Sequence, residues 1–91
     1  MSENITQYYV QLAASYENVG DFKSAIKYYK AAYETSKKDI LLYHLGRNYD
    51  VYYKDKSTAI AYFKRYLDSD DTIKLAKEYT RSRLNELEFY R

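Results

Sequence analysis

Apolar residues recur at every third or fourth position through most of the chain, and this spacing predicts amphipathic α-helices. Polar stretches separate five such segments, so we expect helices over residues 5–18, 22–36, 40–53, 58–67 and 72–89. With no proline and only two glycines to interrupt helices, the 91-residue chain is predicted to form one all-α domain. The predicted inward faces comprise Tyr9, Leu12, Ala13 and Tyr16; Phe22, Ala25, Ile26, Tyr29 and Ala32; Leu42, Leu45, Gly46 and Tyr49; Ala59, Ile60, Phe63 and Tyr66 or Leu67; and Ile73, Ala76, Tyr79 or Thr80, Leu84 and Leu87.

The polar stretches carry signals for ending one helix and starting the next. Gly20 can adopt the left-handed conformation that ends a helix, and Asp21 directly after it is a favoured N-cap. Residues 19–21 therefore predict a tight turn between two helices. Further capping candidates are Ser2 or Asn4, Asp39, Asp55 or Ser57, and the cluster Ser69, Asp70 and Asp71.

The first two predicted helices repeat in the next two. Two apolar positions of the first helix reappear 33 residues later, and two of the second helix reappear 34 residues later. The one-residue difference falls in a polar turn, where an insertion disturbs packing least. A fixed period of this size is typical of arrays of stacked helix pairs. The equivalent positions are Leu12 and Leu45, Tyr16 and Tyr49, Ala25 and Ala59, and Tyr29 and Phe63.

These positions follow the pattern W-x2-L-G-x2-Y, then A-x3-F, then P, of a repeat of about 34 residues. The two copies read Tyr9-x2-Leu12-Ala13-x2-Tyr16 with Ala25-x3-Tyr29, and Leu42-x2-Leu45-Gly46-x2-Tyr49 with Ala59-x3-Phe63. The sequence thereby resembles the tetratricopeptide repeat (TPR) family. The resemblance implies one TPR-like domain over 1–91, with repeats at about 6–38 and 39–71 and a C-terminal capping helix at about 72–89.

Two features depart from the family pattern. Lys37 and Asp71 stand where the family often has proline, and the second copy has no glycine at its internal turn. The junctions between repeats are therefore expected to be less sharply fixed, and the internal turn of the second copy is expected to differ in geometry from Gly20-Asp21, whereas the helix pairs themselves are unaffected.

The resemblance implies a right-handed superhelical stack of antiparallel helix pairs, an α-solenoid of five helices. In this family the first helices of successive repeats line a concave groove that holds a peptide or a partner segment. It implies a protein–protein interaction scaffold whose groove is lined by Gln7, Val10, Gln11, Ala14, Glu17, Tyr43, His44, Arg47 and Asp50, with Lys77 and Arg81 of the last helix at one end. Val10 and Ala14 occupy the places of the lysine and asparagine that clamp a C-terminal carboxylate in some members, so we expect no clamp of that type.

The small number of repeats favours a second interpretation. A helix pair cannot bury its own apolar stripe, and about three repeats are usually needed for stability. Two repeats and a cap therefore also suit a structural or self-association module, or a fragment of a longer array. This interpretation predicts an exposed apolar face on the first helix, through which the chain could self-associate.

Composition narrows the classes of partner. The chain has 15 basic and 13 acidic residues, a formal charge of +2, which is small for a nucleic-acid-binding protein. Its 14 tyrosines suit half-buried seams and contact surfaces, and stacking of bases on them is the weakest of the binding hypotheses. No signal peptide or membrane-spanning stretch is visible, and the compartment stays open.

Residues capable of catalysis or metal binding are few. Cysteine is absent, which excludes disulfides and thiolate metal sites, and His44 is the only histidine. Since no nucleophile pattern or phosphate-binding glycine loop occurs either, we expect no enzyme, no cofactor and no metal. Arg47 and Asp50 lie three residues apart, so they either pair with each other or contact a ligand.

Overall fold

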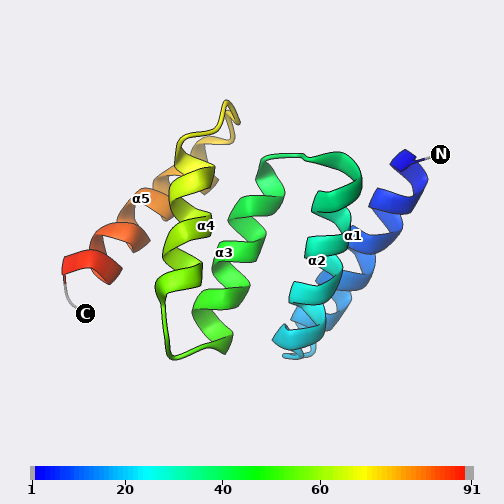
Figure 1. Cartoon of the computed structure of the whole chain (residues 1–91), viewed down its shortest axis with the longest axis horizontal. Helices are drawn as coiled ribbons and strands as arrows, with labels where there is room; N and C mark the ends of the chain where they lie inside the picture. Colours follow the sequence, from blue (N-terminus) through cyan, green and yellow to red (C-terminus); the bar gives the residue numbers. More distant parts are fainter. Residues whose placement is uncertain (1, 90–91) are drawn as a thin grey trace.

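The computed structural model describes residues 2–89, with side chains from residue 4 onward. This part of the chain contains five helices and no strand: α1 (Ser2–Asn18), α2 (Phe22–Ser36), α3 (Ile40–Tyr52), α4 (Ser57–Leu67) and α5 (Lys74–Phe89). The all-α prediction is therefore confirmed. Figure 1 shows the helices side by side along the longest of three dimensions of 42 × 28 × 19 Å, with α1 and α5 at opposite ends of the row. Successive connections alternate between the two ends of the helices, so consecutive helices run in opposite directions.

The turn between α1 and α2 forms as predicted. Gly20 has a φ of 82°, in the left-handed region that glycine adopts without a steric penalty. The Asp21 carboxylate accepts hydrogen bonds from the Ser24 backbone N–H at 3.1 Å and from the Ser24 hydroxyl at 2.8 Å. These bonds satisfy donors at the start of α2, so Asp21 is a true N-cap.

The connection between α2 and α3 explains one departure from the TPR pattern. Lys37 has a φ of 55° and its N–H donates to the Tyr33 carbonyl at 2.8 Å. Proline fixes φ near −65° and has no N–H, so it could not occupy this position. Asp39 occupies the N-cap position of α3, as predicted, but its side chain makes no capping hydrogen bond.

The remaining boundaries differ from the predictions by a few residues. Helix α1 extends through Asn4, which therefore cannot be its N-cap. The N-cap of α4 is Lys56 and not Asp55 or Ser57 as predicted, although the Asp55 carboxylate accepts from the Ser57 N–H at 3.0 Å. Helix α5 begins only at Lys74, so Ile73 lies before it and is 49% exposed instead of facing inward.

The core follows the predicted inward faces. Helices α1, α2 and α3 share one cluster, and α4 packs between α3 and α5. Gly46 allows α3 and α4 to approach closely, because a Cβ atom there would lie 2.5 Å from the Phe63 ring. The most deeply buried apolar side chains are Ala13, Ala25, Tyr29, Ala32, Leu41, Leu45, Ala59, Phe63 and Tyr66.

Candidate functional site

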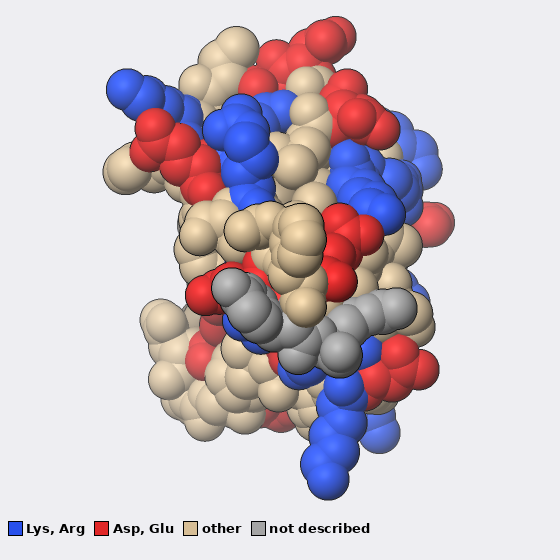
Figure 2. Space-filling view, turned by 90° about the vertical axis from the view of Figure 1, so that its left-hand side faces the viewer, with Lys and Arg blue, Asp and Glu red and all other residues tan. Residues whose placement is uncertain are grey.

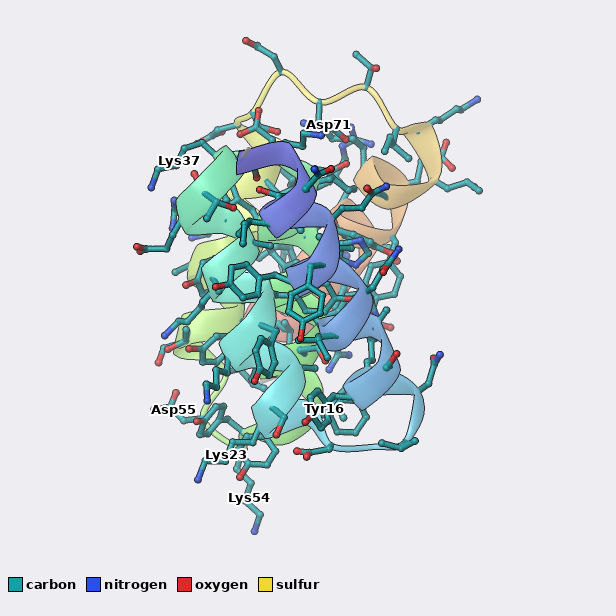
Figure 3. All side chains as sticks on the ribbon, turned by 90° about the vertical axis from the view of Figure 1, so that its right-hand side faces the viewer. Tyr16, Lys23, Lys37, Lys54, Asp55 and Asp71 are labelled. Atoms are coloured by element: carbon teal, nitrogen blue, oxygen red, sulfur yellow. The ribbon has the colours of Figure 1, made fainter. Side chains whose placement is uncertain are left out.

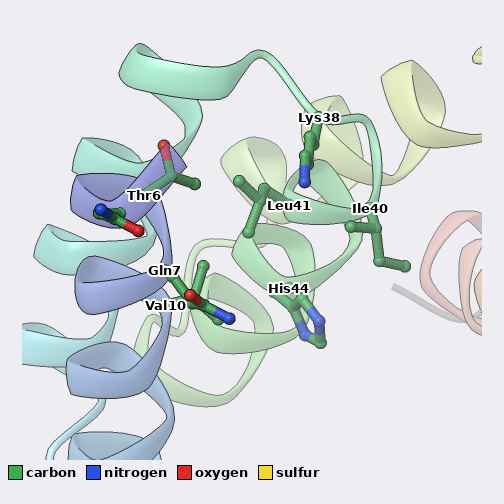
Figure 4. A pocket seen from close by; sticks show the side chains of 8 residues that line it. Thr6, Gln7, Val10, Lys38, Ile40, Leu41 and His44 are labelled. Carbon is green, nitrogen blue, oxygen red and sulfur yellow. The ribbon is translucent and has the colours of Figure 1, made fainter. Parts of the chain in front are cut away.

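A cleft of about 490 Å³ lies between α1 and the first turns of α3. Figure 4 shows side chains from the two helices facing each other across it. Three of the predicted groove residues, Gln7, Val10 and His44, line this cleft. Its other lining residues are Asn4, Thr6, Lys38, Ile40 and Leu41.

Hydrogen bonds fix the α1 wall of the cleft. The Thr35 hydroxyl of α2 donates to the Ala32 carbonyl at 3.0 Å, which leaves its oxygen as acceptor for the buried Thr6 hydroxyl. This chain of bonds ties α1 to α2 beside the cleft. The wall is therefore held in place before any ligand binds.

The predicted ligand-binding arginine is already paired within the protein. The Arg47 guanidinium donates to both Glu17 oxygens, at 2.6 Å and 3.3 Å, and lies over the Tyr43 ring. Glu17 also accepts from the Tyr29 hydroxyl at 3.0 Å. Burial alone would raise the Glu17 pKa, but the Arg47 hydrogen bond and charge outweigh it and lower the pKa. Arg47 thus connects α3 to α1 and is not a free anion receptor.

His44 is the group that joins this network to the cleft. Its ring stacks on Tyr29, with centroids 5.0 Å apart, and its Nδ1 lies 2.9 Å from an Arg47 nitrogen. Because arginine only donates, Nδ1 accepts and the remaining proton of the neutral ring is on Nε2. Burial, and then the Arg47 charge, lower the His44 pKa to about 4. His44 is therefore a neutral polar group in the cleft wall at pH 7.

Asp50, which was predicted to line the groove, lies outside the wall of this cleft. It is only 6% exposed, and it accepts from Arg83 of α5 at 2.7 Å and 3.1 Å and pairs with Lys56 at 3.4 Å. Burial would raise its pKa, but the hydrogen bonds and charges of Arg83 and Lys56 lower it. Arg47 and Asp50 accordingly pair with other residues and not with each other.

The carboxylates of the two internal ion pairs occupy equivalent places in the repeat. Asp50 follows Glu17 by 33 residues, the same shift that relates the first helices. Each carboxylate is held by two hydrogen bonds from an arginine on a later helix: Arg47 of α3 for Glu17, and Arg83 of α5 for Asp50. Paired bonds of this kind are the strongest and most directional that arginine forms. They fix α1 to α3 and α3 to α5.

The other predicted groove residues also lie elsewhere. Lys77 donates to the carbonyls of Tyr66 at 2.9 Å and Ser69 at 2.8 Å, so it caps the end of α4 instead of closing a groove. Tyr43 packs among the rings of His44, Tyr66 and Tyr79. Gln11, Ala14 and Arg81 are not part of the cleft wall.

The sequence reasoning missed the residues that begin α3. Lys38, Ile40 and Leu41 line the cleft, yet they lie outside the repeat pattern and carry no motif of their own. The run of three apolar residues from 40 to 42 was the available signal, because a single helical stripe rarely needs adjacent apolar residues.

No protein-family model, curated protein or solved structure matches this chain. None of the described helices is long and apolar enough to span a membrane. Within the described residues, no group of three or more histidine, aspartate or glutamate side chains is arranged to hold a metal ion.

Proposed function

We propose that the chain is a TPR-like protein–protein interaction module that binds a short peptide in the cleft between α1 and α3. The observation that supports this best is the position of the cleft. It lies between the first helices of the two sequence repeats, where predicted groove residues from both helices come together. The proposal includes the right-handed solenoid arrangement, and no catalytic step, cofactor or metal.

The cleft wall indicates the chemistry of the peptide. Val10, Ile40 and Leu41 give it an apolar lining, while Gln7 and the neutral His44 supply polar groups. Lys38 is the only charged residue among those that line it. Because Arg47 is engaged by Glu17, ion pairing contributes little, and we infer a peptide with one or two apolar side chains that enter the cleft.

A pair of tryptophan substitutions tests the cleft. Gln7 and Gln11 are both exposed on α1, one helical turn apart, but only Gln7 lines the cleft. Peptides with central Leu, Ile or Phe side chains would be screened on an array and then titrated by calorimetry. We expect Gln7→Trp to weaken the bound peptide at least tenfold and Gln11→Trp to leave its affinity within twofold. Equal effects of the two variants, or no peptide bound by the wild type, would refute the proposal.

A second candidate function is self-association through the outer face of α1 and α2. Ile5 and Tyr8 of α1 are 39% and 57% exposed. They lie beside a row of tyrosine rings in which Tyr28 stacks between Tyr9 and Tyr16, at centroid distances of 6.1 Å and 5.7 Å. An exposed aromatic face of this kind suits contact with another copy or a neighbouring repeat. Analytical ultracentrifugation over a concentration series measures the molecular mass of the chain and of its Tyr8→Glu variant. If both sediment as monomers at high concentration, this function is excluded for the isolated chain.

A further inference from the structure

Five cations form one surface on α2 and α4, here called the basic tyrosine face. It comprises Lys23, Lys27, Lys30 and Lys37 along α2 and its C-terminal cap, with Arg65 of α4, and all five are exposed. Figure 3 shows Lys23 and Lys37 projecting from the same side of the molecule near opposite ends of α2. That side faces the viewer in Figure 1. The spacing of 23, 27 and 30 keeps their side chains on one face of the helix.

Two hollows run along this face and meet at Lys30. One, of about 610 Å³, includes Lys23, Lys27, Lys30, Tyr49 and Tyr53 in its wall. The other, of about 340 Å³, includes Lys30, Tyr33, Lys37, Tyr62 and Arg65. Ile26 contributes apolar surface to the first and Leu45 to the second, so each hollow combines cations with a hydrophobic lining.

These five cations lack carboxylate partners. Among the described residues, none of them forms an ion pair, and Glu34 is the single acidic residue that lines either hollow. Four of them lie over tyrosine rings instead. The charged groups of Lys27, Lys30 and Lys37 are 5.4 Å, 5.7 Å and 5.1 Å from ring centroids, and that of Arg65 is 5.6 Å from Tyr33. A ring orients a cation without neutralising it. The face therefore keeps a net positive charge, with five cations and the single acidic residue Glu34.

At the α5 end of the stack, two cations are paired with carboxylates. Figure 2 shows Lys and Arg side chains there among those of Asp and Glu. Lys64 pairs with Glu88 at 3.0 Å, and Arg83 pairs with Asp50 and Glu86. Within the described residues, Lys74 and Arg81 of α5 also form no ion pair, so the basic tyrosine face is distinguished by five cations arranged around two hollows and not by unpaired charge alone.

We propose that the basic tyrosine face binds an acidic polypeptide segment of about seven residues in extended conformation. The α2 stripe from residue 23 to residue 37 is about 21 Å long at ~1.5 Å per residue. An extended chain covers that length in about six or seven residues. Carboxylates along such a segment can meet successive cations, while side chains between them enter the hollows.

Nucleic acid fits this face less well than an acidic peptide. Bases bind single-strand sites by stacking on free aromatic faces. Here Tyr49 is already stacked between Tyr53 and Tyr62, each 5.4 Å away, and cations cover Tyr28, Tyr33 and Tyr62. The rings therefore position cations and leave little room for bases.

Fluorescence anisotropy with a labelled peptide of seven glutamates tests this proposal. We expect binding at 50 mM salt that weakens at least tenfold at 300 mM salt, because exposed charges are screened. Lys30→Glu, at the junction of the two hollows, is expected to weaken binding at least tenfold. Lys74→Glu makes the same change in net charge at an exposed position of α5 and is expected to change affinity by less than twofold.

Three results would overturn the proposal. The first is that the acidic peptide does not bind at 50 mM salt, and the second is that Lys30→Glu and Lys74→Glu lose the same amount of affinity. The third is that a labelled ten-residue oligo(dT) binds more tightly than the acidic peptide. Circular dichroism checks that both variants stay helical. The Gln7→Trp variant is expected to bind the acidic peptide with the affinity of the wild type. The proposal for the α1–α3 cleft and the proposal for this face can therefore fail independently of each other.

Discussion

The cations around α3 form ion pairs within the protein, whereas those along α2 do not. Around α3, Arg47 and Arg83 pair with Glu17 and Asp50 and so connect helices that are far apart in the sequence. Lys56, in the connection between α3 and α4, also pairs with Asp50. Along α2, Lys27, Lys30 and Lys37 lie over tyrosine rings and have no carboxylate partner in the described part of the chain. The same residue types therefore serve architecture on one side and remain available for binding on the other.

The largest effect on stability is expected from breaking the buried pair. Asp50→Asn keeps the shape of the side chain but removes the charge that holds Arg83 and Lys56. Truncating a buried ion pair leaves its partner uncompensated, and because both partners are partly exposed we expect a loss of about 2–3 kcal/mol. Urea denaturation followed by circular dichroism measures it.

Asp70→Asn, at an exposed position in the α4–α5 connection, is the control. Equal urea midpoints for the two variants would show that Asp50 has no architectural role.

A pH titration of stability tests the arginine–histidine contact. The folded His44 has a pKa of about 4, below the ordinary histidine value of 6.5, so the unfolded chain binds a proton first as the pH falls. Stability is therefore full above about pH 6.5 and falls as the pH is lowered toward 4. Between pH 7 and pH 5 we expect a loss of about 1–2 kcal/mol.

The same titration separates His44 from the paired carboxylates. The pKa values of Glu17 and Asp50 are lowered from 4.5 and 3.8, so their contributions are lost mainly below pH 5. His44→Gln is expected to flatten the curve between pH 5 and pH 7 only. If the variant keeps the slope of the wild type in that range, His44 is not the group responsible.

The smallest effect is expected on the basic tyrosine face. Lys27→Ala removes an exposed cation that lies over Tyr28 but breaks no ion pair in the described structure. We expect the free energy of unfolding to change by less than about 0.5 kcal/mol in urea denaturation. A loss as large as that of Asp50→Asn would mean that both sets of cations are structural, and the contrast between the two sides would disappear.

Local signals in the sequence predicted the fold well. Gly20 and Asp21 specify their turn through their own backbone and side chain, and the apolar spacing around Ala25 and Tyr29 identifies the buried face of α2. Helix ends without a capping residue or a glycine were predicted less accurately, as at the start of α5. The resemblance to the TPR family rests on the repeated positions themselves, and the superhelical arrangement that it implies stays a prediction.

The candidate site was harder to predict because it depends on contacts between distant residues. Glu17 and Arg47 are separated by 30 positions and Asp50 and Arg83 by 33, so no local spacing marks either pair. An arginine on the groove side of a helix has the same sequence pattern whether it binds a ligand or pairs with a carboxylate of the protein itself. Only the packing of α1, α3 and α5 decides which cations are already engaged.

The missing Cβ atom at Gly46 limits how this chain could be rearranged. Its counterpart in the first helix pair is Ala13, and its neighbour across the pair is Phe63, at the place held by Tyr29 in the first. A methyl group at 46 would collide with the phenyl ring, so α1 and α4 could not be combined directly. The unit that evolution or an engineer can duplicate, delete or exchange is therefore the complete helix pair, with its own matched glycine or alanine and its own ring.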